Sequence, residues 1–176
     1  MRVVYKNRIS GLFSLLVSSI MLLFIVSKTT TLKQPLMLVA LLWVYILVNY
    51  LICRHFNRSN ISDAKITKWA VSFYLQLVLL AWLFNAIFFY LELEHVDSAM
   101  LYLILVSVGY SAGAVTAYHQ LKWAPPVFIA SALVPQMAYY LLPHSQNNPI
   151  MASMLLFIFA FLSMISLEQH KNWIAT

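Results

Sequence analysis

Six long apolar segments, separated by short polar stretches, run through most of the chain. None of the six contains Asp, Glu, Lys, Arg or His. Each is roughly 17 to 23 residues long, which matches the helix length that crosses a hydrocarbon core of about 30 Å. Because continuous apolar runs lack the alternation of a membrane β-barrel, the pattern predicts an all-α, polytopic bundle of six transmembrane helices. The predicted helices span about 10–26, 35–53, 69–91, 98–118, 126–142 and 150–167, in a single transmembrane domain of residues 1–176.

Positive charges are distributed unevenly between the two ends of these helices. With the N-terminus in the cytoplasm, nine of the eleven Lys and Arg residues fall on the inner side, and only Lys28 and Lys33 on the outer side. Short cytoplasmic loops of membrane proteins carry such an excess. The sequence therefore predicts two cytoplasmic termini and a multi-pass membrane protein. The inner residues are Arg2, Lys6, Arg8, Arg54, Arg58, Lys65, Lys68, Lys122 and Lys171.

Composition narrows the functions that such a bundle can have. Hydrophobic residues make up 62% of the chain and charged residues 9%, which is far from the range of soluble domains. The net charge of +6 is explained by anionic inner-leaflet lipids, so we expect lipid contacts and no nucleic-acid partner. The five histidines lack metal-binding spacing and no catalytic motif is present, so we expect no metal, no cofactor and no enzymatic activity. Segments without ionisable groups also argue against pumps and proton relays.

Polar and aromatic side chains inside the predicted helices are the candidate binding residues. Counting helix rise places five of them near the middle or the outer half of the bilayer. Buried amides need hydrogen-bond partners in hydrocarbon, and such a set is typical of an outward-opening pocket for a small amphipathic or apolar molecule. The alternative is that the amides only bond neighbouring helices. The candidate ligand-binding residues are Trp82, Asn85, Tyr102, Ser107 and Gln136.

Two further features concern helix shape and packing. Pro135 lies well inside the fifth predicted helix, where it removes a backbone donor and frees carbonyls one turn earlier. We therefore expect a kink and treat Pro135 as a candidate hinge. Gly109 and Gly113 lie four residues apart on one face of the fourth predicted helix. Their small size favours close packing of another helix within the bundle over a dimer interface.

Several residues at the ends and in the middle of the predicted helices follow an order that is known from one group of membrane modules. They are Tyr5-Lys6-Asn7 before the first helix, Pro35 at the start of the second, Arg54 and Arg58 after it, Trp69 at the start of the third, Trp82 within it, Gly109 and Gly113 in the fourth, and Pro135 in the fifth. In this layout the chain resembles the six-helix N-terminal membrane module of bacterial sensor histidine kinases and of diguanylate cyclases or phosphodiesterases. The resemblance covers almost the whole chain. It implies a sensor of the bacterial cytoplasmic (inner) membrane whose sixth helix leads into a cytoplasmic output domain, with homodimerisation through that domain. Because the chain ends nine residues after the sixth predicted helix, we expect such a domain beyond Thr176 or on a separate protein.

Other classes of function are also compatible with the sequence. Leu32-Lys33-x-Pro35 before the second helix is similar to Leu121-Lys122-x-x-Pro125 before the fifth. These helices would cross in opposite directions, so a true repeat would be inverted, as in many small transporters. Segments without charge would restrict such a transporter to neutral or lipid-like solutes. A structural membrane subunit is the third alternative. The sequence favours a sensory module without catalysis of its own.

Overall fold

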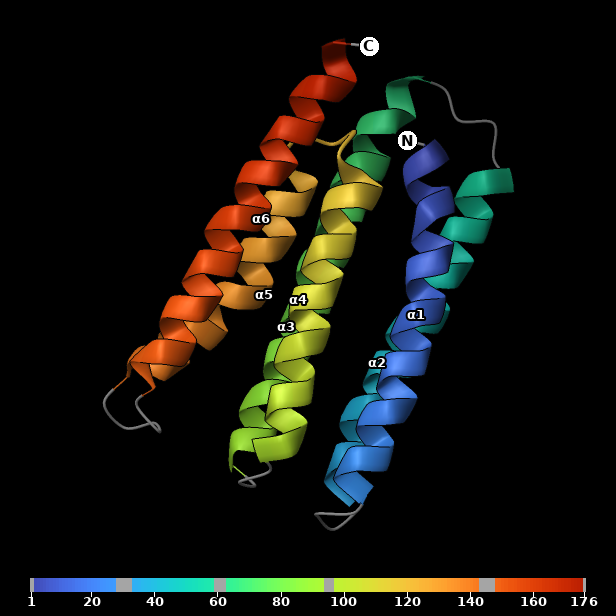
Figure 1. Ribbon diagram of the computed structural model, residues 1–176. Coiled ribbons are helices and arrows are strands. Elements are labelled where there is room, and N and C mark those ends of the chain that lie inside the picture. Colours follow the sequence, from blue (N-terminus) through green and yellow to red (C-terminus); the bar gives the residue numbers. More distant parts are fainter. Residues whose placement is uncertain (1, 28–32, 59–62, 94–96, 143–147, 176) are drawn as a thin grey trace. The chain divides into compact units, whose positions relative to one another are not determined.

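In the computed structural model the chain forms six α-helices in the order that the sequence predicts (Figure 1). The structure describes residues 2–27, 33–58, 63–93, 97–142 and 148–175, and these contain no β-strand. The all-α fold is therefore confirmed. The helices are α1 Arg2–Ser27, α2 Lys33–Arg58, α3 Asp63–Leu93, α4 Asp97–Tyr118, α5 Ala124–Leu141 and α6 Pro149–Ala175.

Several helices extend beyond the apolar segments that predict them. α1 begins at Arg2, eight residues before the predicted start at 10, and α6 ends at Ala175 instead of near 167. An apolar segment marks only the part of a helix that suits hydrocarbon, whereas the backbone hydrogen-bond ladder continues into polar sequence. One consequence is that Arg8, which the sequence places in a cytoplasmic stretch, belongs to α1.

Among the described residues, five of the six helices are long and apolar enough to cross a membrane. These spans are Arg8–Ile25, Leu36–Phe56, Thr67–Leu91, Met100–Tyr118 and Pro149–Ala175. α5 is not among them, because its 18 residues include three prolines, Gln136 and two tyrosines, which lower its hydropathy. The five apolar helices support a multi-pass membrane protein, and the crossing of α5 stays a prediction.

Large apolar side chains cover the outer faces of these helices. Phe13 on α1 and Phe157 on α6 are each 70% exposed, and Ile150 is 71% exposed. In water such surfaces would favour association, whereas in a bilayer they contact acyl chains. The exposed faces therefore agree with membrane insertion.

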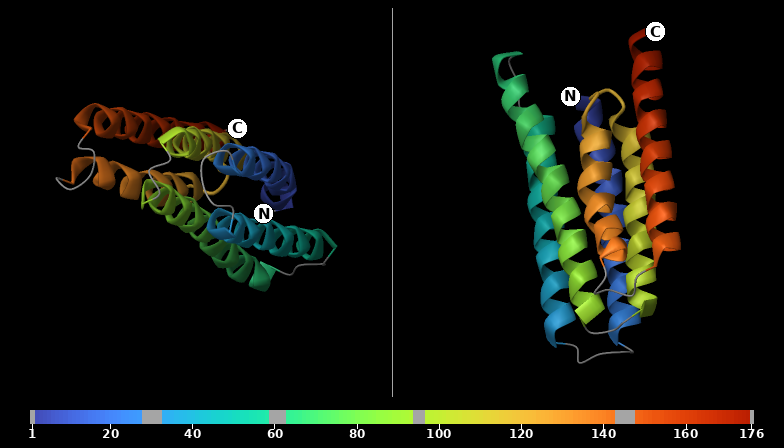
Figure 2. Two further views of the ribbon diagram at one scale, coloured as in Figure 1. Left: turned by 90° about the horizontal axis from the view of Figure 1, so that it is seen from below. Right: turned by 90° about the vertical axis from the view of Figure 1, so that its left-hand side faces the viewer.

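Contacts within the chain divide it into two compact units, so that α3 and α4 each contribute to both. Unit 1 comprises Met1–Gln76 and Ala86–Ile104, and unit 2 comprises Leu77–Asn85 and Leu105–Thr176. Unit 1 contains the packed pair α1 and α2, and unit 2 contains the packed pair α5 and α6. Figure 2 shows each pair side by side in two directions of view.

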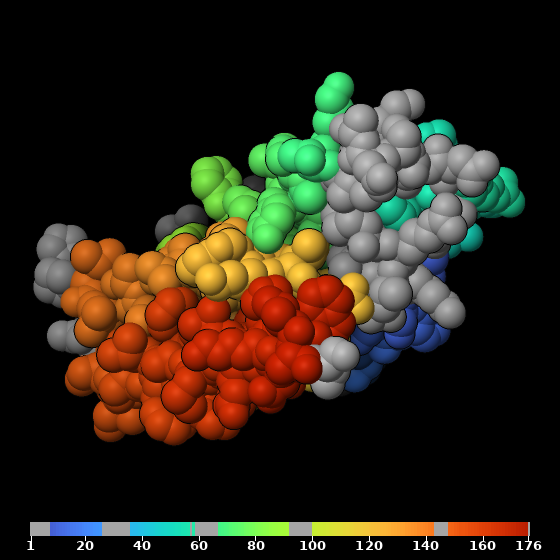
Figure 3. Space-filling view, turned by 90° about the horizontal axis from the view of Figure 1, so that it is seen from above, coloured from blue at the N-terminus to red at the C-terminus, as the bar shows by residue number. Residues whose placement is uncertain are grey.

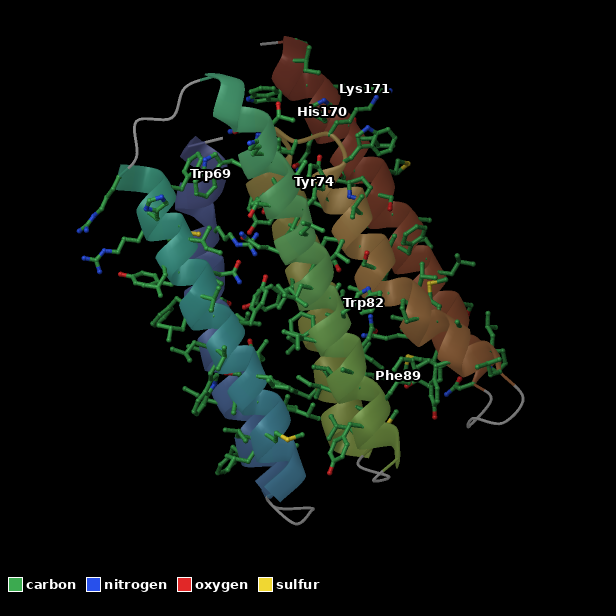
Figure 4. All side chains as sticks on the ribbon, turned by 180° about the vertical axis from the view of Figure 1, so that it is seen from behind. Trp69, Tyr74, Trp82, Phe89, His170 and Lys171 are labelled. Carbon is green, nitrogen blue, oxygen red and sulfur yellow. The ribbon has the colours of Figure 1, made fainter. Side chains whose placement is uncertain are left out.

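In unit 1, aromatic packing joins the end of α2 to the start of α3. The rings of Phe56 and Trp69 meet edge to face, with centroids 4.9 Å apart. Trp69 is labelled in Figure 4. The indole Nε1 of Trp43 donates to the hydroxyl of Ser19 at 2.8 Å, which ties α2 to α1. These contacts join α2 to both α1 and α3 in unit 1.

In unit 2, α6 packs against the turn that joins α4 to α5. Nδ1 of His170 lies 2.7 Å from the backbone oxygen of His119, and Figure 3 shows α6 (red) beside this turn (gold). α5 then begins with Pro125 and Pro126 in its first turn, where a missing N–H leaves no helical hydrogen bond unmade. The two prolines therefore favour a helix start directly after this turn.

Candidate functional site

Asn85 hydrogen-bonds to the backbone of α5 at the place where Pro135 removes one bond from that helix's hydrogen-bond ladder. Pro135 has no N–H, so the carbonyl of Ser131, four residues earlier, has no donor within its own helix. Nδ2 of Asn85 donates to the backbone oxygen of Ser131 at 2.8 Å, and the Asn85 side chain is buried. Asn85 on α3 therefore supplies the hydrogen bond that Pro135 removes from α5.

The second amide in unit 2, Gln136, bonds to α4. Its Nε2 donates to the hydroxyl oxygen of Ser107 at 3.2 Å, and both side chains are fully buried. An unpaired buried amide costs about 1–3 kcal/mol, so this contact favours one register of α5 against α4. The burial expected for Asn85, Ser107 and Gln136 is thus observed, and each of them bonds a neighbouring helix. A ligand-binding role for them stays a prediction.

Each of the two amides keeps one oxygen without a partner. Oδ1 of Asn85 and Oε1 of Gln136 have no hydrogen-bond donor among the described residues. Buried polar atoms without partners are uncommon in native proteins, and each calls for an explanation such as strain, ordered water or function. These two oxygens are therefore unused hydrogen-bond acceptors among the described residues of unit 2.

Trp82 and Tyr102 do not join this group. The indole of Trp82, labelled on α3 in Figure 4, is 69% exposed, so the expectation that it faces the interior beside Asn85 is wrong. Side chains three residues apart in a helix point in directions that differ by about 60°. The ring of Trp82 therefore points outward, although Asn85 in the same helix is buried. Tyr102 belongs to unit 1, where its hydroxyl donates to the backbone oxygen of Ser18 at 3.1 Å.

The two glycines of α4 also differ from the expectation. A side chain added at Gly109 or Gly113 would meet nothing within 4 Å among the described residues, and both positions are exposed. Within unit 2, therefore, no described helix packs closely against the pair. The spacing of four correctly places both glycines on one face, but it does not reveal the direction in which that face points.

Replacing Gly113 by leucine is consequently expected to leave stability unchanged or to raise it by up to about 1 kcal/mol, because leucine has the higher helix propensity. The matched change Ala132→Leu, at a fully buried position of α5, should destabilise the protein by about 1–3 kcal/mol through overpacking. Thermal unfolding in a mild detergent measures both changes. Equal losses of stability in the two variants would show that a helix does pack against the glycines.

Arg8 is a buried cation that the hydropathy pattern does not identify. Its side chain is 2% exposed, and its Nη2 donates to the hydroxyl of Tyr45 at 2.7 Å and to Oδ1 of Asn49 at 2.8 Å. The guanidinium carbon lies 4.8 Å from the centre of the Phe73 ring. The expectation that the interior lacks ionisable groups is therefore wrong. A hydropathy pattern ends a segment at its first charged residue, whereas α1 continues through Arg8.

The hydrogen bonds around Arg8 connect three helices of unit 1. The Tyr45 hydroxyl donates to the backbone oxygen of Gln76 on α3 at 2.7 Å, and Nδ2 of Asn49 donates to the backbone oxygen of Tyr45 at 2.8 Å. Tyr45 and Asn49 lie one turn apart on the same face of α2. Two polar residues on one face of an apolar helix indicate that this face meets a polar group inside the protein, and here that group is Arg8.

The described side chains contain no group of three or more His, Cys, Asp or Glu residues that could hold a metal ion. Cys53 is buried and is not in a disulfide. The acidic stretch Glu92–Asp97 and the two histidines His95 and His144 have side chains outside the described residues. The candidate functional groups are therefore the buried polar side chains of Arg8, Asn85 and Gln136 with their hydrogen bonds.

No family model, curated protein or solved structure matches the chain. The resemblance to sensor modules therefore rests on the layout of the sequence. The fold and the polar contacts rest on the structure of this chain.

Proposed function

We propose that the chain is a membrane-embedded sensory and signal-transduction module that responds to a small amphipathic or apolar molecule or to the state of the bilayer. The module has no catalytic role of its own. Its output comes from a cytoplasmic domain beyond Thr176, through which it forms a homodimer, or from a separate partner. Both termini lie in the cytoplasm of a bacterial inner membrane that the six helices cross. The sequence layout shared with sensor modules supports this proposal.

The observation that carries the proposal is the bond between Asn85 and Ser131. One side chain of α3 closes the gap that Pro135 leaves in the hydrogen-bond ladder of α5. Interhelical hydrogen bonds within membrane proteins contribute about 0.6–2 kcal/mol. A bound molecule that competes for this bond therefore changes the balance between two shapes of α5 by a factor of about 3 to 30. Such a balance is what a signalling element needs.

The acceptors without partners lie beside this interruption. Gln136 follows Pro135 directly, and Ser131 precedes it by one turn. A molecule that donates to Oε1 of Gln136 or Oδ1 of Asn85 thus acts on the residues that border the predicted hinge. Binding and the change of helix shape are coupled because they involve the same side chains.

Distances between spin labels on α4 and α5 test this role. We place the labels at Leu105 and Leu141, which are both 62% exposed, in a Cys53→Ser background, and measure double electron–electron resonance in nanodiscs. Asn85→Ala removes the hydrogen bond to the backbone oxygen of Ser131, so the distance distribution should shift or gain a second population. A rigid structural subunit would keep one unchanged distribution, and that result would overturn the proposal.

Two controls assign the effect to the interruption in α5. Labels at Leu105 and Trp123 report on the half of α5 before Pro135, and their distance should not change. Pro135→Ala restores an N–H for the carbonyl of Ser131, so Asn85→Ala should have no effect in that background. An equal shift with and without Pro135 would mean that Asn85 acts through a different contact.

A further inference from the structure

We propose that Arg8 forms a binding site for the phosphate group of an anionic phospholipid. The site lies in unit 1 and uses none of the residues around Pro135, so it does not depend on the sensory proposal. It follows from a buried positive charge whose hydrogen-bond donors are only partly used.

The hydrogen bonds and the ring contact of the guanidinium, among the described residues, involve neutral groups only. They are the hydroxyl of Tyr45, the amide oxygen of Asn49 and the ring of Phe73. Asp63, the acid nearest to Phe73 along α3, is ten residues away, or about 15 Å of helix. The other four acids are Glu92, Glu94 and Asp97, near the end of α3 and the start of α4, and Glu168 on α6. A buried charge normally has a partner of opposite charge.

Two nitrogens of the guanidinium have no acceptor. Nη2 makes both bonds to α2, whereas Nε and Nη1 have no hydrogen-bond partner among the described residues. A guanidinium carries five N–H donors in a planar fork and never loses its charge. An oxyanion with several acceptor oxygens, such as a phosphate, satisfies these donors and neutralises the charge.

The depth of Arg8 favours a lipid as the source of that phosphate. Arg8 is the first residue of the apolar span of α1, which is the level at which phospholipid headgroups meet the hydrocarbon core. Arg54, Arg58 and Lys68 are exposed cations at the adjoining ends of α2 and α3, and basic residues at this level attract anionic headgroups. Apolar neighbours such as Phe73 suit the acyl chains of a lipid and do not suit free phosphate.

Native mass spectrometry of the full chain tests the site. The protein is extracted from bilayers that contain equal amounts of phosphatidylglycerol and phosphatidylcholine, and the lipids that stay bound are counted. We expect phosphatidylglycerol to be retained in preference to phosphatidylcholine and not to be displaced by inorganic phosphate. Equal retention of the two lipids would overturn the proposal. Displacement by inorganic phosphate would show that the site binds the free ion instead.

Variants locate the effect at Arg8. Arg8→Gln keeps a polar side chain but removes the charge, and it should lower retention of phosphatidylglycerol about tenfold, the factor that one charge-assisted hydrogen bond provides. Arg8→Lys, which keeps the charge, should retain part of the binding. Arg54→Gln removes an exposed charge near the same end of unit 1 and serves as the matched control. Loss of retention as large in Arg54→Gln as in Arg8→Gln would mean that only diffuse surface charge attracts the lipid.

Discussion

Replacing Asn49 by leucine is expected to destabilise the protein by about 1.5–3 kcal/mol, the contribution of a buried hydrogen bond to a charged group. Asn49 is 2% exposed, and its Oδ1 is one of the two oxygens that bond Arg8. Leucine has the same branched skeleton of four heavy atoms, so the change keeps the shape of the side chain while it leaves the guanidinium with the Tyr45 hydroxyl as its one hydrogen-bond partner among the described residues. Titration with a denaturing detergent in mixed micelles without anionic lipid measures the free energy of unfolding.

A second substitution should remove most of this cost. In the double variant Arg8→Met with Asn49→Leu, no buried charge is left without partners, and apolar replacement of a whole buried polar set is often neutral or stabilising. We therefore expect stability close to that of the wild type. If the two substitutions instead add their losses, Arg8 and Asn49 stabilise the protein independently, and the buried network does not act as a unit.

Hydropathy predicted the helices because the length and the apolar character of a membrane span follow from the thickness of the bilayer. The same reasoning did not locate the helix ends, since a helix continues into polar sequence without a change in its backbone hydrogen bonds. Arg8 was missed for this reason. Its burial depends on Tyr45 and Asn49, which are about forty positions away in the chain, and no local pattern records such a pairing.

The sequence predicted the candidate site only for side chains that must be buried and hydrogen-bonded wherever they lie in hydrocarbon. An amide in hydrocarbon must find a partner, so the burial of Asn85 and Gln136 followed from their positions. The partner of Asn85 was half predictable, because Pro135 frees a carbonyl, but which side chain would reach it depends on how α3 and α5 pack. Trp82 has no such constraint, since an indole is stable against lipid as well as inside a bundle. Its outward direction therefore could not be read from the sequence.

Membrane crossing is the premise on which both the sensory role and the lipid site depend. The lipid site needs only α1, α2 and α3 to cross, whereas the sensory role needs α5 to cross as well. Lys122 before α5 and Lys171 near the end of α6 favour one side of the membrane, which requires both α5 and α6 to cross. Residues 59–62 and the end of α6 should therefore be cytoplasmic, and residues 143–147 should be exterior.

Dual reporter fusions of alkaline phosphatase and green fluorescent protein at these three places measure the topology directly. We predict fluorescence without phosphatase activity for fusions at 59–62 and after Ala175, and the reverse for fusions at 143–147. The expected differences are all or none, because each reporter is active on one side of the membrane only. Phosphatase activity after Ala175, together with fluorescence at 143–147, would show that α5 does not cross and would contradict the six-helix account.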